Sequence, residues 1–284
     1  MAVTDLSRFA GRWFVVKIGG ELLSDPATLG SGIAPAIRDL SRAKVKLAIV
    51  HGGGPQATQL SRRLGLKTVK VAGRRVTDAA TLEVMKMALA GQASVDLAAA
   101  LGRAGVRAIA TTGVSASLVE ARRRPPVAVS GGGPAPIDFG WVGDVVRVDV
   151  QLFEQLAAIP LVIALAPLAT DGQGNVFNVN ADIVAARVAS ELRAARLFLV
   201  SQVPGVLQDV SDPGTRIPHL DRKHAVAQIG SGVIHGGMIP KVEAGLAALE
   251  AGVESVHLIA GEPADALVQE SINPGSCGTV LLGD

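Results

Sequence analysis

Cysteine, tyrosine and tryptophan are scarce in this sequence. Its 284 residues include one cysteine, Cys277, two tryptophans and no tyrosine. A single cysteine excludes an internal disulfide and a metal site built from several thiolates. Aromatic residues make up 3% of the chain, and its lysines and arginines are scattered. The stacking aromatics and clustered basic residues of a nucleic-acid binder are missing, so we expect no nucleic-acid partner.

Targeting and membrane signals are also absent. The first residues, MAVTDLSRFAGRW, contain no apolar core of a signal peptide, and no later stretch predicts a span across a bilayer. We therefore expect a soluble, cytoplasmic protein with no membrane partner. The net charge is +2, and the length suits one large α/β domain or two lobes of ordinary size.

The most informative stretch is KLAIVHGGGPQA, residues 46–57. Leu47–Val50 has the length and composition of a buried strand. Three glycines follow, and Pro55 suits the first turn of a helix running toward Leu64. Backbone N–H groups converge at such a turn, and missing Cβ atoms let a ligand come close. The stretch therefore predicts a site for a phosphate or a carboxylate.

Strands alternate with helices along the rest of the chain. The expected strands are Trp13–Ile18, Val106–Thr111, Leu161–Ala166, Leu197–Ser201, Val256–Ala260 and Thr279–Leu282. The expected helices are Pro26–Ser41, Asp78–Arg103, one near Gln151, Asn180–Leu192 and Pro240–Glu250, with hairpins in Thr68–Val76 and Leu118–Val150. This alternation predicts an α/β fold with a mostly parallel central sheet in an αβα sandwich. We expect one domain, 1–284, whose turn-rich segment Asp209–Pro218 lies between two lobes.

Two lysines occupy positions that are unfavourable without an anion. Lys17 ends a buried strand just before Gly19 and Gly20, where an unpaired ammonium group is costly. Lys241 lies in the first turn of a helix, where the helix dipole disfavours a cation. For Lys17, a surface position at the strand end is an equally good interpretation. Asp182 follows a residue suited to an N-cap, so ordinary helix-start chemistry also explains it.

Together these clusters suggest phosphoryl transfer. Two lysines and two glycine turns would surround a charged phosphate chain, while one carboxylate holds both ammonium groups. Phosphoryl transfer needs positioning and charge neutralisation more than covalent help. The sequence contains neither a GxxxxGK[ST] motif nor the HRD and DFG motifs of protein kinases, so a kinase of another design is predicted.

Six motifs resemble the amino acid kinase family over almost the whole chain. They are KIGG at Lys17, VHGGG at Val50, GRRVTD at Gly73, DFGWVGDV at Asp138, NVNAD at Asn178 and GGMIPKVEA at Gly236. Within that family the set is most similar to the enzymes that phosphorylate the side-chain carboxylate of N-acetyl-L-glutamate with ATP, in arginine biosynthesis. The resemblance implies a carbamate kinase-like fold.

The resemblance also implies roles for individual residues. Lys17 and Lys241 would stabilise the transferring phosphoryl group as catalytic residues, and Asp182 would orient them. Gly53 and Gly54 would offer N–H groups to the substrate and the phosphoryl oxygens. The acyl substrate would bind in an N-terminal lobe of about 1–167 and the nucleotide in a C-terminal lobe of about 168–284.

Further residues complete the two expected binding sites. Arg75 would bind a substrate carboxylate, and Asn178 would complete that pocket. The residues expected to bind the nucleotide are Gly19, Gly20, Gln202, Val203, Pro204, Gly205, Val206, Leu207, Val233, Ile234 and His235. Mg²⁺ would be held mainly by the ATP phosphates, without a protein metal ligand. A carboxylate nucleophile has a pKa near ~4 and is already deprotonated at neutral pH, so no catalytic base is needed.

Two segments depart from the family pattern. Thr112–Ser117 replaces a glycine-rich SGKDG-like segment, and Gln202 stands where an acidic residue or asparagine is common. The near alternative is an aminoadipate-type kinase of lysine biosynthesis that acts on a carrier-bound or acetylated substrate. NVNAD and the DFGWVGDV segment favour acetylglutamate.

Three other classes stay open at this point. Gly52–Ala57 fits the dinucleotide pattern GxGxx[GA], with Asp78 roughly 20 residues on as a ribose-binding acid of a dehydrogenase. His51–Gly54 and Ser130 imitate the oxyanion loop and nucleophile of a hydrolase, although the prolines after Ser130 disfavour the required helix. A regulatory relative without catalysis is the third class; the presence of both lysines and Asp182 argues against it.

We expect a homodimer joined through the long helix near Thr81–Leu101. In this family, arginine-inhibited hexamers are associated with a long N-terminal helix, and here only 16 residues precede Lys17. The resemblance therefore implies weak or no inhibition by arginine.

Overall fold

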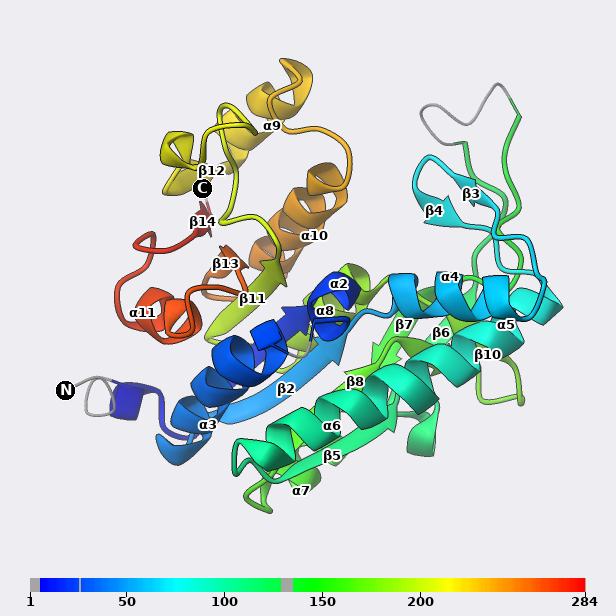
Figure 1. Cartoon of the computed structure of the whole chain (residues 1–284), viewed down its shortest axis with the longest axis horizontal. Helices are drawn as coiled ribbons and strands as arrows, with labels where there is room; N and C mark the ends of the chain where they lie inside the picture. Colours follow the sequence, from blue (N-terminus) through cyan, green and yellow to red (C-terminus); the bar gives the residue numbers. More distant parts are fainter. Residues whose placement is uncertain (1–5, 26, 129–134, 284) are drawn as a thin grey trace.

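The structure, a computed structural model, describes residues 6–25, 27–128 and 135–283. Its central sheet contains β1 (Trp13–Ile18), β2 (Lys46–His51), β5 (Ala108–Thr112), β8 (Val162–Ala166), β11 (Arg196–Ser201), β12 (His219–Asp221), β13 (Val256–Ala260) and β14 (Thr279–Leu282). The strand order is β12-β14-β13-β11-β1-β2-β8-β5 (Figure 1). Every neighbouring pair is parallel except β13 and β14, so the predicted mostly parallel sheet is confirmed.

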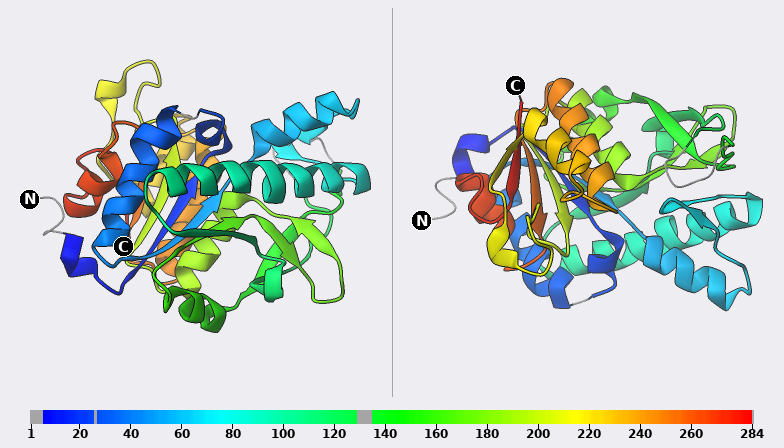
Figure 2. Two further views of the ribbon diagram at one scale, coloured as in Figure 1. Left: turned by 60° about the horizontal axis from the view of Figure 1, so that its bottom comes forward. Right: turned by 90° about the horizontal axis from the view of Figure 1, so that it is seen from above.

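Both faces of the sheet are buried because its strands are apolar on both sides. On β1, Val15 packs into one core cluster, while Phe14 and Val16 pack into another on the opposite face. The first cluster lies under α7 (Val150–Ala157), α8 (Ala181–Glu191), α9 (Arg222–Gly230) and α10 (Met238–Glu250). The second lies under α2 (Gly20–Leu23), α3 (Ala34–Arg42), α6 (Ser94–Arg103) and α11 (Ala266–Ile272). This is the predicted αβα sandwich (Figure 2).

The long helix predicted after Asp78 is present. It consists of α5 (Ala79–Met85), the π-helical η3 (Lys86–Ala93) and α6, which continue one another. By length and composition this helix could cross a membrane, contrary to the expectation that no stretch qualifies. Its buried side chains, among them Leu89 and Leu97, nevertheless pack into the protein core. It is a core helix of a folded domain.

Short elements complete the fold beside the sheet. The 118–150 region contributes β6 (Val119–Arg123) and β7 (Gly143–Val148) to a second sheet with β9 (Leu168–Thr170) and β10 (Val176–Asn178). A separate hairpin joins β3 (Lys70–Val71) to β4 (Arg74–Arg75), as predicted. The remaining elements are η1 (Ser7–Phe9), η2 (Thr28–Ile33), α4 (Gly54–Arg63), η4 (Ser115–Ser117) and η5 (Pro213–Thr215). The helix expected from Pro26 is divided between η2 and α3, and Pro26 itself lies outside the described residues.

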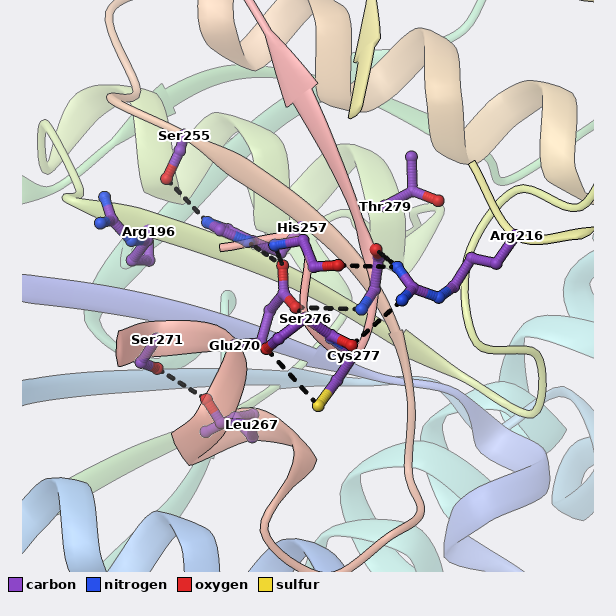
Figure 3. Close-up of polar contacts among 12 residues, drawn as sticks. Arg196, Arg216, Ser255, His257, Leu267, Glu270, Ser271, Ser276, Cys277 and Thr279 are labelled. Carbon is purple, nitrogen blue, oxygen red and sulfur yellow. Dashed lines mark hydrogen bonds and ion pairs between the residues drawn. The ribbon is translucent and has the colours of Figure 1, made fainter. Parts of the chain in front are cut away.

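A buried polar cluster holds the loop before β14 (Figure 3). The Glu270 carboxylate accepts from His257 Nδ1 at 2.9 Å and from the backbone N–H groups of Gly275, Cys277 and Gly278 at 2.7–2.9 Å. Burial acts to raise the pKa of Glu270, but these donors outweigh it and leave the pKa below its ordinary value. Thr279 then accepts from the Val206 N–H at 2.9 Å. The cluster therefore supports the segment in which the nucleotide-binding residues were predicted.

Candidate active site

The candidate site lies at the carboxyl ends of neighbouring parallel strands. β11, β1 and β2 are adjacent, so the segments that follow them lie together. These segments are the predicted nucleotide loop from Gln202, the turn Gly19–Gly20 and the turn Gly52–Gly54. In open α/β sheets this edge is where ligands bind.

Two cavities meet at this edge. The larger is a cleft of about 760 Å³, and the smaller has a volume of about 320 Å³. Glu21 and Lys241 line both of them. The arrangement suits two ligands that exchange a group at the junction.

Most predicted site residues line one of these cavities. Those in the cleft are Lys17, Gly20, Gly53, Gly54, Arg75, Asn178, Asp182 and Lys241. Those in the smaller cavity are Gln202, Val203, Gly205, Val206, Leu207, Val233, Ile234 and His235. Gly19 and Pro204 line neither of the two cavities, and Gly20 faces the cleft rather than the smaller cavity.

Lys17 and Asp182 form a buried ion pair. Lys17 Nζ lies 3.0 Å from Asp182 Oδ1, and the two residues are only 6% and 7% exposed. Asp182 reaches this position because Asn180 caps α8 and its side chain accepts from the Asp182 N–H at 2.7 Å. The alternation of β1 puts Lys17 on the same face as Val15, under α8 and α10. The strand-end lysine is thus not a surface residue.

Lys241 approaches the same carboxylate from α10. Its ammonium donates to the Gly237 carbonyl at 3.2 Å, which folds the side chain toward the start of the helix. Burial lowers the pKa of Lys241, and the positive charge of Lys17 acts in the same direction, while Asp182 and Glu21 oppose the change. A phosphate bound where the two cavities meet would favour the charged form of Lys241.

The glycine turn after β2 is shaped by close packing. A Cβ on Gly53 would lie 2.3 Å from Leu89 Cδ2 of the long helix, so a larger residue there would require the Leu89 side chain to move. A Cβ on Gly54 would meet nothing within 4 Å. Gly54 is the first residue of α4, and Pro55 follows it as predicted. The free N–H groups at this helix start are suited to an anion.

Arg75 projects from β4 into the cleft. It donates to the Gly54 carbonyl at 3.2 Å and to the hydroxyls of Thr58 and Thr68 at 2.8 Å and 3.2 Å. Burial lowers the pKa of Arg75, and within the described residues no carboxylate forms an ion pair with it. Because it has no such partner, the Arg75 guanidinium is available to a carboxylate ligand.

Asn178, at the end of β10, lines the same cleft and donates to Thr77 Oγ1 at 3.2 Å.

Comparison with known proteins assigns the chain to a family. A model described as the amino acid kinase family matches residues 12–260. The chain belongs to the amino acid kinase family. The acetylglutamate kinase of Sorangium cellulosum (strain So ce56) is 48% identical over 270 residues, which cover 94% of this chain and 94% of that protein. A kinase family implies ATP as the phosphoryl donor.

Solved structures agree with this amino acid kinase fold. N-acetylglutamate synthase from Neisseria gonorrhoeae, complexed with coenzyme A and N-acetyl-glutamate, matches with a TM-score of 0.83 at 24% identity. That match covers 100% of this chain but 62% of the synthase chain. Carbamate kinase from Giardia lamblia bound to AMP-PNP matches with a TM-score of 0.69 at 15% identity, covering 97% and 99% of the two chains. At these identities the two structures show the fold alone.

The sequence analysis missed several residues that line the kinase site. Glu21 directly follows the first glycine turn, so its position in the sequence could have indicated that it belongs to the site. Arg124 and Asp144 line the cleft as an ion pair, with 2.6 Å between Arg124 Nη2 and Asp144 Oδ1. Asp144 belongs to the DFGWVGDV motif, but its contact with Arg124 depends on the pairing of β6 with β7, which no local pattern specifies. Lys70 and Arg74 of the hairpin add further positive charge to the cleft.

The structure also bears on the competing interpretations. Asp78 caps α5 by accepting from the Thr81 N–H at 2.7 Å, and it does not end a second buried strand as a dehydrogenase requires. Ser130, the residue considered as a hydrolase nucleophile, lies outside the described residues. The segment Thr112–Ser117 begins at the last residue of the edge strand β5 and lines neither cavity. The two cavities are therefore lined by other segments of the chain.

Proposed function

We propose that the protein is an acetylglutamate kinase, which transfers the terminal phosphoryl group of ATP to the side-chain carboxylate of N-acetyl-L-glutamate in arginine biosynthesis. The observation that carries this proposal is the junction of the two cavities. Lys17 and Lys241 converge there on a single buried carboxylate, Asp182. The full-length similarity to acetylglutamate kinases supports the choice of substrate.

The acyl substrate binds in the larger cleft. Arg75 holds its α-carboxylate, because the half-buried guanidinium has donors to offer and no ion-pair partner in the described residues. Asn178 closes the same side of the pocket. The side-chain carboxylate then extends toward the turn at Gly53 and Gly54, where helix N–H groups face it.

ATP binds in the smaller cavity, between the segments 202–207 and 233–235. Its terminal phosphate extends to the junction, where Lys17 and Lys241 neutralise charge as the phosphoryl group moves. The attacking carboxylate is ionised at neutral pH, since its pKa lies near ~4 in solution. The residues here therefore orient two anions and need not remove a proton.

Mg²⁺ completes this proposal through the ATP phosphates. Within residues 6–25, 27–128 and 135–283 no group of three His, Cys, Asp or Glu side chains is arranged to hold a metal ion. Glu21 is exposed and lines both cavities, so its carboxylate is placed to reach a phosphate-bound ion. When bound, the ion neutralises phosphate charge.

The protein acts as one domain, with the acyl substrate in an N-terminal lobe of about 1–167 and the nucleotide in a C-terminal lobe of about 168–284. It works as a cytoplasmic homodimer. The long helix supports this assembly, because Met87 and Val95 on it are 49% and 62% exposed, and Ile109 on the edge strand β5 is 39% exposed. Arginine inhibits weakly or not at all. Light scattering at micromolar protein, with and without arginine, tests the assembly, and a stable hexamer would contradict it.

The activity is tested by trapping the acyl phosphate with hydroxylamine. The purified protein is incubated with MgATP and N-acetyl-L-glutamate, N-acetyl-L-2-aminoadipate or L-glutamate. We expect ATP-dependent hydroxamate with N-acetyl-L-glutamate and at least tenfold lower kcat/KM with the other two. A preference for the aminoadipate derivative would replace this substrate assignment, and no hydroxamate with any acceptor would contradict the proposed reaction.

A further inference from the structure

The two glycine turns at the site touch each other backbone to backbone. The Gly52 N–H donates to the Ile18 carbonyl at 2.8 Å. A Cβ on Gly20 would lie 2.8 Å from Gly53 N, and a Cβ on Gly52 would lie 2.8 Å from Gly20 N. Backbone hydrogen bonds hold the N–H groups of Gly19 and Gly52, but no glycine side chain is present to fix the peptide planes that follow Gly20 and Gly52. Other groups must therefore orient the N–H donors that face the cleft.

His51 supplies one such contact. The side chain is fully buried, with Nδ1 at 2.8 Å from the Gly52 carbonyl and Nε2 at 2.9 Å from Ser94 Oγ. A carbonyl only accepts, so Nδ1 carries the hydrogen and Nε2 accepts from the Ser94 hydroxyl. Burial lowers the pKa of His51, which keeps the ring neutral. The imidazole thus links the turn to the first residue of α6.

Gln56 supplies the other contact. It is 5% exposed, and its Nε2 donates to the Gly20 carbonyl at 3.0 Å and to Ser24 Oγ at 3.0 Å. Gln56 stands in the first turn of α4, the helix that starts at Gly54. The amide therefore connects the helix after the second glycine turn to the first glycine turn.

These contacts determine where N–H groups point. In a planar trans peptide the C=O and the following N–H point in opposite directions. Because His51 holds the Gly52 carbonyl, the Gly53 N–H points away from the imidazole. Because Gln56 holds the Gly20 carbonyl, the Glu21 N–H points away from the Gln56 amide. Gly53 is buried, and its N–H donates to no acceptor in the part of the chain that the structure describes. A buried free N–H is costly unless a ligand accepts from it.

We infer that His51 and Gln56 are positioning residues that hold the two glycine turns as one rigid anion cradle at the point of phosphoryl transfer. The inference rests on the proposed kinase function and deepens it. Neither side chain lines the two cavities, so both act through the backbone. Donors fixed in advance stabilise charge that develops in the transition state, so their misalignment lowers kcat more than it raises KM.

The test compares isosteric and conservative variants. His51→Leu removes both hydrogen bonds, whereas His51→Asn can place its amide Nδ2 where Nδ1 donates to Gly52. Gln56→Met keeps the shape and loses the donor. We expect His51→Leu and Gln56→Met to lower kcat about 10- to 100-fold while both KM values change less than threefold. We expect His51→Asn to recover at least a third of the kcat.

A matched control separates positioning from stability. Ser271 is a fully buried hydroxyl on α11 that donates to the Leu267 carbonyl at 2.7 Å, away from the two cavities. Ser271→Ala should lower the thermal midpoint and leave kcat unchanged. If His51→Leu fails to fold, Ser94→Ala removes only the remote end of the same contact, and Gln56→Met tests the other turn independently. We expect a kcat loss in each of these two variants.

A binding measurement gives a second readout. The probe is MgADP with aluminium fluoride in the presence of N-acetyl-L-glutamate, titrated calorimetrically beside MgADP alone. The variants should bind the fluoride complex at least tenfold more weakly and MgADP within twofold of the wild type. Wild-type kcat in both His51→Leu and Gln56→Met, or equal weakening of the two ligands, would overturn the inference. An inactive wild type would instead overturn the proposed function.

Discussion

Replacing Lys17 by Met should damage both stability and catalysis. Methionine keeps the length of the side chain but removes the ammonium that lies 3.0 Å from Asp182 Oδ1. Asp182 is 7% exposed, so its charge would stay buried without its nearest partner. The variant therefore differs from an ordinary active-site substitution, which leaves the fold intact.

The stability loss follows from breaking a buried pair. Removing one partner of such a pair typically costs about 3–5 kcal/mol. We expect about 3 kcal/mol for Lys17→Met, because Lys241 also acts on Asp182 and the pair opens onto the cleft. The catalytic loss adds to this. Loss of one preorganised donor to developing charge corresponds to about 2.7–4 kcal/mol, which lowers kcat by about 10²- to 10³-fold.

A double variant distinguishes the two effects. Lys17→Met with Asp182→Asn removes both charges, so urea unfolding should show most of the stability restored. Hydroxamate formation should stay as low as in Lys17→Met, because neutralising Asp182 does not replace the missing ammonium. Asp182→Asn alone is the matched control, because it measures the effect of neutralising Asp182 while Lys17 is present. Recovery of kcat in the double variant, or wild-type stability of Lys17→Met, would refute the reasoning.

Three further substitutions test other parts of the structure. Burial lowers the pKa of Lys241 below its ordinary value of 10.5, so kcat/KM for ATP should begin to fall at a pH below 10.5. The kcat should persist to higher pH, because bound phosphate favours the ammonium form. The pH–rate profiles of the wild type and of Lys241→Arg check both expectations. Arg75→Lys should raise KM for the acyl substrate about tenfold and change KM for ATP less than twofold in initial-rate measurements, since lysine cannot form the bidentate contact. Glu270→Gln should lower the free energy of unfolding by about 1–3 kcal/mol in urea, because the amide cannot accept from all four donors.

Much of the sheet could be predicted because its strands are continuous apolar runs. β1, β13 and β14 begin and end at the predicted residues, since glycine or polar residues bound each run. The antiparallel direction of β14 was not predicted, because composition carries no information on the direction of a neighbour. β9, β10 and β12 have three residues each, too few to show any periodicity. α9 and α11 were also missed; they have nine and seven residues.

The candidate site was predictable where its residues follow a strand end or start a helix. Lys17, Gly53 and Asp182 occupy such positions, and local rules pointed to each of them. The 3.0 Å contact between Lys17 and Asp182 joins segments 165 positions apart. The chemistry of the clusters suggested that one carboxylate holds the lysines, and the resemblance to a family gave that role to Asp182. His51 was considered only as part of a tight turn or a hydrolase oxyanion loop. Its contact with Ser94 depends on the long helix packing against the turn, which no local pattern specifies.

The ion pair at Lys17 does not exhaust the donors of the site. An ammonium group has three N–H bonds, and Asp182 lies within reach of one of those of Lys17. Lys241 likewise uses one N–H on the Gly237 carbonyl. Each lysine therefore keeps two donors, and the N–H groups at Gly53 and Gly54 add two more at the start of α4. A buried carboxylate that pairs with Lys17 while leaving these donors free is what a transferring phosphoryl group requires, because its charge is spread over three oxygens.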